Sequence, residues 1–284
     1  MSGILMKCQN QIKMKPVIVF FLLCFSFGVW SQEPINNKAH NTVFGLGEEL
    51  TYKATFLGMT AGKAVTRVDK SHHKILGKTC YKIDVFGETS DWLSWVTKVK
   101  DLWVTYMDTS SLATRATYRK IREGRYRKDE WVTFNQETGK AAVQVVDKKT
   151  EKYGEAKIYD LPPNATDIVG GFMHLRFFDF EKTKKGDTLS IRGFFEDASY
   201  TLKILYSGKD ILKTKFGKIP CHILVPVMPD NQLFDGENSI TVWISDDKNK
   251  IPVKMSAKMF IGSTGIELIG FRGLRNSIRV LVNQ

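Results

Sequence analysis

Hydrophobic and polar residues alternate with a period of two along most of this chain. The alternation is clearest at residues 50–56, 240–244, 251–261 and 278–282. A strand presents successive side chains to opposite faces, so strict alternation indicates one buried face and one solvated face. That arrangement is typical of antiparallel sheets, because they need not be covered on both sides.

Turn sequences rich in glycine, aspartate and asparagine separate these segments. Examples are Gly58–Gly62, Glu123-Gly124, Asp235-Gly236 and Asp246–Asn249. The segments between such turns amount to about a dozen strands, a number that suggests a barrel or a deeply curved sheet. The sequence therefore predicts an all-β fold: a large antiparallel curved sheet or half-open barrel with one helix.

One stretch, residues 168–180, departs from this period. Its apolar residues follow helical spacing, Pro162-Pro163 precedes it, and either Thr166 or Asp167 is a suitable N-cap. We expect a helix here that turns its apolar side chains toward the sheet. Its paired glycines weaken it by about 1 kcal/mol each relative to alanine. Residues 91–96 are a second candidate for a short helical turn.

The first 31 residues have the features of a cleavable signal peptide. Lys7, Lys13 and Lys15 precede an apolar run at residues 17–30, and a polar stretch follows. This run is shorter than the ~20 residues of a membrane span. An uncleaved anchor and a buried first strand remain the alternatives. We predict a signal peptide over residues 1–31, a linker over 32–43 and a single antiparallel β domain over 44–284.

The charge balance favours anionic partners. The formal charge is +12, and loss of three lysines and no acidic residue with the signal peptide leaves +9. A basic exported protein is suited to membrane surfaces or phosphorylated glycans, whereas export argues against nucleic acid. The mature chain keeps Cys80 and Cys221. Their apolar neighbours favour buried free thiols, with a disulfide as the alternative.

The most specific sequence lies in the last third of the chain: Trp243-Ile244-Ser245-Asp246-Asp247, Ile251-Pro252-Val253, Gly262 and Gly265. Together with Gly47–Tyr52, Ala61-Gly62 and the expected helix, this sequence resembles the domain-of-unknown-function 3108 family. The resemblance covers roughly residues 44–273. It implies an exported, mostly antiparallel β protein of Gram-negative bacteria, similar to half-open barrels that carry lipids or lipoproteins. It brings no established reaction, so no catalytic residue can be transferred.

Motifs for catalysis or metal binding are weak in this sequence. The histidines lack metal-ligand spacing, since the adjacent pair His72-His73 would point to opposite faces of a strand. The first candidates for paired catalytic carboxylates are Asp246-Asp247, and the second candidates are Glu196-Asp197. Neighbouring acidic residues in a turn, however, more often stabilise the turn than catalyse a reaction. We predict no catalytic residue, no metal and no cofactor.

Four arginines are the main candidates for ligand binding. Arg115, Arg119, Arg125 and Arg127 flank the turn of a predicted hairpin, among other cations and aromatic residues. Arginine pairs with phosphate or carboxylate through two hydrogen bonds. We therefore expect this hairpin to expose the four arginines and to bind anionic envelope components or lipid. The alternative is a charged hairpin that only prevents edge aggregation.

Trp243 is the fifth candidate for ligand binding. Neighbouring side chains in a strand alternate, so Trp243 is expected on the face opposite Val242 and Ile244. There it either stacks on a ligand at the mouth of the barrel or completes a hairpin. In the second case, the aspartates that follow it bond nearby backbone amides.

These features together predict a non-catalytic protein of the cell envelope, in the periplasm or at the periplasmic face of the outer membrane. It is expected to bind an apolar or amphiphilic ligand, or an envelope polymer, in the concavity of the sheet, with peripheral membrane contact. A hydrolase of envelope glycan and a structural partner of an outer-membrane assembly remain the alternatives. An apolar cavity would favour binding, and two carboxylates facing each other across a polar cleft would favour hydrolysis.

Overall fold

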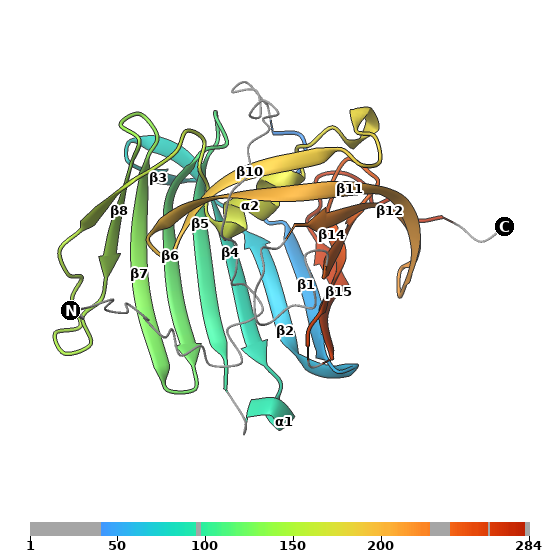
Figure 1. The fold of residues 1–284 in the computed structure, drawn as a ribbon, viewed down its shortest axis with the longest axis horizontal. Coiled ribbons are helices and arrows are strands. Elements are labelled where there is room, and N and C mark those ends of the chain that lie inside the picture. The colour runs from blue at the N-terminus through green and yellow to red at the C-terminus, as the bar shows by residue number, and fades with distance from the viewer. Residues whose placement is uncertain (1–40, 95–97, 228–238, 261, 282–284) are drawn as a thin grey trace, which may run out of the picture.

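The computed structural model describes residues 41–94, 98–227, 239–260 and 262–281, and Figure 1 shows its fold. The predicted signal peptide lies outside these residues. The helices are α1 (Asp91–Ser94), α2 (Ile168–Leu175) and the 3-10 helix η2 (Phe180–Lys182). The strands are β1 (Glu49–Phe56), β2 (Met59–Val68), β3 (His73–Ile75), β4 (Lys78–Thr89), β5 (Lys100–Asp108), β6 (Thr114–Glu123), β7 (Tyr126–Asn135), β8 (Lys140–Val145), β9 (Lys157–Asp160), β10 (Thr188–Phe195), β11 (Ala198–Thr214), β12 (Gly217–Pro226), β13 (Ile240–Ser245), β14 (Pro252–Lys258) and β15 (Ser263–Arg272).

The described strands form one sheet of 15 strands. Their order is β10-β11-β12-β13-β14-β15-β1-β2-β4-β5-β6-β7-β8-β9, and β3 pairs with β4 outside this path. Every pair of neighbouring strands is antiparallel. The prediction of an all-β fold with a large, curved antiparallel sheet is therefore confirmed.

The two ends of the strand order meet through side chains. Phe194 of β10 packs in one apolar cluster with Val132 and Phe134 of β7 and Val143 of β8. The segment before α2 also joins β10, since Phe194 N donates to Thr166 O over 2.9 Å. Among the described residues, β9 and β10 share no ladder, so the barrel is closed by packing and remains open in its hydrogen bonding.

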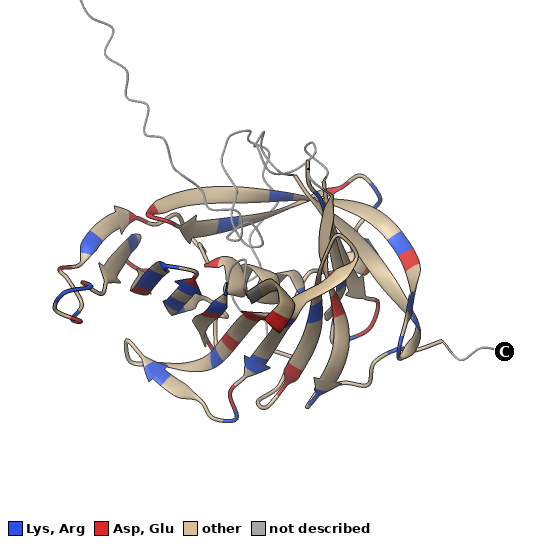
Figure 2. Cartoon of the chain, turned by 90° about the horizontal axis from the view of Figure 1, so that it is seen from below, with Lys and Arg blue, Asp and Glu red and all other residues tan. Residues whose placement is uncertain are grey.

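Helix α2 lies within the curve of the sheet (Figure 2). The Asp167 side chain caps it by accepting hydrogen bonds from Val169 N and Gly170 N, and Thr105 Oγ1 on β5 donates to the same carboxylate. The predicted N-cap Asp167 is confirmed. The predicted helix forms but ends at Leu175 instead of continuing to residue 180, and α1 forms in the second candidate region. Among the described residues, no helix has the length and apolar character needed to cross a bilayer.

Side chains fill the space between α2 and the sheet. Val169 and Met173 pack into a cluster with β2, β4, β5 and β6, while Leu175 packs into a second cluster with β10 to β13. A cavity beside Trp103 holds only about 20 Å³, room for roughly one water molecule. This packing leaves little room there for the amphiphilic ligand expected in the concavity.

Two segments differ from what the sequence pattern indicates. Asn41 and Val43, assigned to a linker, are buried at 4% and 6% exposure because the Asn41 carboxamide accepts hydrogen bonds from the backbone of Val43 and Phe44. Residues 278–281 form no ladder strand and make a single bridge, between Leu281 and Lys218. Their alternation has another cause: Ile278 and Val280 pack on the cluster formed by β1, β12, β14 and β15.

Cys80 and Cys221 are buried free thiols, as predicted. Cys80 lies on β4 and Cys221 on β12. Burial raises the pKa of Cys80 to about 11 and that of Cys221 to about 12. The thiolate is the reactive form of cysteine, so both groups are expected to be inert toward oxidation and labelling in the folded protein.

Candidate functional site

The hairpin formed by β6 and β7 separates the four predicted arginines into two environments. Arg125 and Arg127 are exposed at the turn. Arg115 and Arg119 are buried, at only 7% and 6% exposure. The expectation that all four share a solvated surface is therefore wrong. The hairpin does not project from the molecule, because β5 and β8 flank it and β10 packs on its inner face.

Arg119 belongs to a buried network of charges. Its guanidinium binds Glu130 on β7, lies 2.8 Å from Glu196 in the β10–β11 turn, and sits 4.3 Å from the centre of the Phe195 ring. Lys128 bridges the same acids, at 2.7 Å from Glu130 and 3.0 Å from Glu196. This network joins the β10–β11 hairpin to β6 and β7, which is a structural role.

Arg115 is held by two acidic residues in the same way. It donates to Asp108 Oδ2 over 2.9 Å and to Glu137 Oε1 over 2.8 Å. Burial alone would raise the pKa of Asp108, but hydrogen bonds from Ser110, Ser111 and Arg115 lower it to about 2. Arg115 is thus paired with one buried acid, Asp108, and one exposed acid, Glu137.

Four turns meet at one end of the barrel, the lower edge in Figure 1. The β1–β2 turn contacts the β14–β15 turn, since Leu57 N donates to Ser263 O over 2.8 Å. Trp92 of α1 donates from Nε1 to Thr60 O over 2.6 Å. The β6–β7 turn joins the set through the 2.9 Å bond from Gly124 N to Lys98 O. We call the exposed side chains of these four turns the barrel-end surface.

The barrel-end surface combines large apolar side chains with cations. The apolar residues, each between 39% and 62% exposed, are Leu57, Met59, Trp92, Tyr126 and Phe260. The exposed cations are Lys98, Lys100, Arg125, Arg127 and Lys258. None of these cations makes an ion pair within the described part of the chain. Two exposed acids, Glu88 and Asp91, lie nearby, so positive charge dominates.

An open depression of about 530 Å³ lies within this surface, beside α1. Lys63, Lys98 and Lys100 line it together with the acids Glu88 and Asp91. The hydroxyl-bearing residues Thr60, Thr89 and Ser90 complete its wall. Ammonium groups are donors that bind phosphate and carboxylate oxygens.

Sequence pattern alone identified only Arg125 and Arg127 of this surface. A signal for the rest exists in the sequence. Leu57 and Met59 flank Gly58 in a tight turn, where polar residues are usual, and Phe260 stands in the next turn along the surface. Large apolar residues exposed at adjacent turns are a recognisable mark of an interaction surface.

Trp243 faces away from Val242 and Ile244, which are buried in the interior. Its ring is covered by Lys254, whose Nζ lies 5.5 Å from the ring centre, and its Nε1 donates to Asp210 Oδ2 over 3.3 Å. The predicted orientation is confirmed. Through these contacts, Trp243 packs β13 against β14 and β11.

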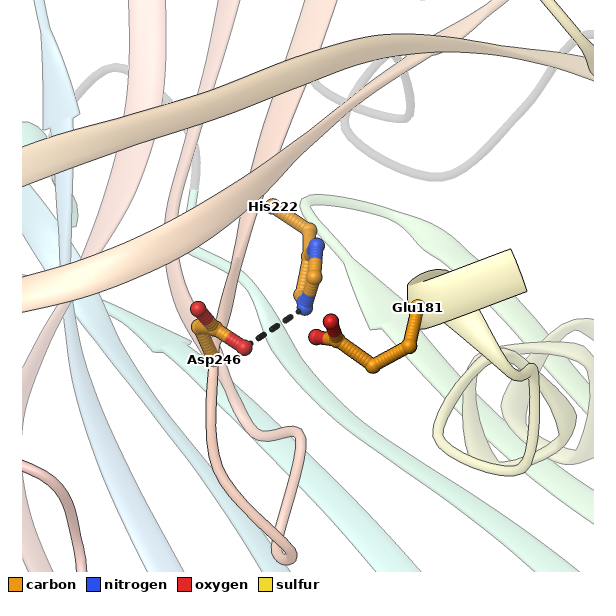
Figure 3. A group of neighbouring side chains, drawn as sticks. All are labelled: Glu181, His222 and Asp246. Carbon is orange, nitrogen blue, oxygen red and sulfur yellow. Dashed lines mark ion pairs between the residues drawn. The ribbon is translucent and has the colours of Figure 1, made fainter. Parts of the chain in front are cut away.

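Asp246 and Asp247 have separate partners and do not form a facing pair. Asp247 Oδ1 accepts hydrogen bonds from Asn249 N and Lys250 N, the turn role that the sequence indicates. Asp246 instead pairs with His222, and Glu181 approaches both (Figure 3). Imidazole nitrogen and carboxylate oxygen are metal ligands, so this second cluster has the chemistry to hold a divalent ion.

The fold defines a class of β-barrel-like proteins in which a nearly closed antiparallel sheet surrounds one helix. A similar solved structure is a beta-barrel-like protein of domain of unknown function DUF1849 from Brucella abortus, with a TM-score of 0.54 and 12% identity. The match covers 81% of this chain and 98% of that chain. No curated protein matches. The family model described as protein of unknown function (DUF3108) matches residues 51–269, and the chain belongs to this family.

Proposed function

We propose that this protein is a non-catalytic binding protein of the cell envelope that docks on anionic membrane surfaces through its barrel-end surface. The observation that supports this function is the exposure of unpaired cations and large apolar side chains on the same four adjacent turns. The signal peptide predicted over residues 1–31 is consistent with delivery to such a surface.

Cations and large apolar side chains on one surface together favour binding to an anionic membrane interface. Each lysine or arginine near an anionic bilayer contributes about 1 kcal/mol, and this attraction falls off within a Debye length. Aromatic and aliphatic side chains such as Trp92, Tyr126 and Phe260 insert at the boundary between headgroups and acyl chains. The depression beside α1 then offers its lysines to a lipid headgroup. Binding at the end of the barrel does not require space inside it.

Binding of the mature chain, residues 32–284, to vesicles tests this function. Vesicles of phosphatidylglycerol and phosphatidylcholine should bind the wild type, and added salt should weaken the binding. The triple variant K98Q/R125Q/R127Q removes three cations of the barrel-end surface. Its affinity for these vesicles should fall at least tenfold, about 1.4 kcal/mol.

A matched variant separates the surface from the overall charge. K70Q/K74Q/K78Q removes three exposed lysines around β3, at the other end of the barrel, and so changes the net charge equally. This control should bind like the wild type. Equal losses in the two triple variants would mean that net charge alone drives binding, and the proposed surface would be rejected.

A further inference from the structure

Three side chains from separate parts of the chain converge at a second place, away from the barrel-end surface (Figure 3). Glu181 belongs to η2, His222 to β12, and Asp246 follows β13. One ligand atom of each lies within 4.8 Å of the others. His222 Nε2 and Asp246 Oδ1 are already 3.0 Å apart. Small side-chain movements would therefore place all three atoms around a single ion.

The His222 ring is held in an orientation suited to a metal ligand. It is 2% exposed, and the Phe180 ring stacks on it at 4.6 Å between centres. Tyr206 Oη lies 3.0 Å from its Nδ1. When Nδ1 donates its proton to Tyr206, Nε2 presents a lone pair to the two carboxylates, and hydrogen bonds of this kind orient metal-binding histidines.

The two carboxylates already attract a cation in this structure. Lys209 Nζ lies 3.0 Å from Glu181 Oε1 and 3.1 Å from Asp246 Oδ2. Arg279 adds a longer contact of 3.5 Å to Asp246 Oδ2. Both cationic side chains are about half exposed, at 47% and 57%, so each can withdraw into solvent. A smaller, doubly charged ion would satisfy the same carboxylates and also use the imidazole nitrogen.

We propose that Glu181, His222 and Asp246 bind a divalent transition-metal ion of the zinc class, which replaces the Lys209 ammonium between the two carboxylates. This site is independent of the proposed membrane docking and goes beyond it. One nitrogen and two carboxylate ligands suit zinc, and three protein ligands leave a further position for water. Calcium is a poorer candidate, because it takes six to eight oxygen ligands.

Zinc titration of the untagged mature chain, followed by calorimetry, tests the site. The wild type should bind one equivalent. E181Q should weaken binding at least about tenfold, and H222Q should do the same. K209M should tighten binding at least about tenfold, because it removes the competing ammonium. H72Q changes an exposed histidine outside the site and should bind zinc like the wild type.

The proposal can be rejected with E181Q and K209M even if H222Q, which changes a buried residue, fails to fold. Glu181 is exposed on η2, so E181Q removes a ligand without disturbing the core. K209M distinguishes a metal site from a purely structural ion network, because a network without a metal role gives no tighter zinc binding. The proposal is overturned if E181Q retains the zinc affinity of the wild type, or if K209M does not raise it.

Discussion

At the scale of single residues, the buried residues Arg115, Arg119 and Arg176 are each paired with an acid of the same chain. Arg176, at the end of α2, is 1% exposed and donates to both oxygens of Glu48, over 2.6 and 3.1 Å. Its Nε donates to Asn249 O over 2.9 Å. Buried charges are tolerated when hydrogen bonds complete the pair. Arg176, like Arg119, thus fixes the helix and strands to one another.

Glu123 is the buried acid whose ionisation should affect stability most clearly. Burial and the neighbouring Asp101 carboxyl raise the pKa of Glu123 from 4.5 to about 8. The folded protein therefore holds a proton that the unfolded chain releases above pH 4.5, and stability is lost as the pH rises toward 8.

The E123Q variant isolates this effect, because glutamine does not titrate. Between pH 5 and pH 8, the wild type should lose of order 2 kcal/mol of unfolding free energy relative to E123Q. Urea denaturation at both pH values measures this difference. E155Q, at an exposed site, should follow the wild type. A gap between wild type and E123Q that does not change with pH would show that Glu123 is ionised in the folded protein.

Sequence could predict some of these residues and not others. The apolar neighbours of Cys80 and Cys221 correctly indicated buried thiols. For Arg115 and Arg119, the sequence showed only alternation on a hairpin, which places both on one face without saying which face is buried. Their partners Glu137 and Glu196 come from other turns of the chain. Only the three-dimensional pairing of these turns shows that the arginines are buried and paired with acids.

At the scale of elements, the paired glycines of α2 have different roles. A Cβ on Gly170 would lie 2.1 Å from Thr166 Oγ1 and 2.7 Å from Thr114 Oγ1, so the helix approaches β6 as only glycine permits. A Cβ on Gly171 would meet nothing closer than 3.7 Å. Both glycines lower the helix propensity of α2, but only Gly170 is required for close packing of the helix.

This difference gives a matched pair of substitutions. G170A should destabilise the protein by about 1–3 kcal/mol, because the added methyl group overpacks the contact. G171A should be neutral or should stabilise it by up to about 1 kcal/mol, as alanine favours a helix. Thermal or urea unfolding measures both. Equal effects of the two substitutions would contradict the close approach of the helix at Gly170.

The strands themselves were predictable because apolar and polar residues alternate along a strand that has one face buried. The same signal failed at residues 278–281, where apolar side chains alternate against a core cluster and only one bridge, to Lys218 of β12, is formed instead of a ladder. Alternation therefore identifies a half-buried extended segment, whereas ladder pairing depends on a partner strand. Polarity is a similarly incomplete guide at Asn41, which is polar but buried, with its side chain accepting a hydrogen bond from the Val43 backbone.

At the scale of the whole molecule, the barrel-end surface arises from strand order. The turns near residues 58, 92, 124 and 260 are far apart in the sequence, and the antiparallel order brings them to one edge. Sequence therefore predicted the curved sheet and two arginines of this surface. The combination of charge with exposed apolar groups needed the arrangement of all four turns. Its cations have no acidic partner among the described residues, in contrast to the buried Arg115 and Arg119.

The central claim, that this end of the barrel meets an anionic membrane, is tested most directly by a polarity-sensitive dye at a single position. F260C places the dye on the barrel-end surface, and L76C places it in the β3–β4 turn at the other end, where Leu76 is 59% exposed against 62% for Phe260. The two native thiols of the mature chain are buried and should not react. With phosphatidylglycerol vesicles, dye emission from F260C should shift to shorter wavelengths while that from L76C stays unchanged. A shift at both positions, or at neither, would contradict membrane docking through the barrel end.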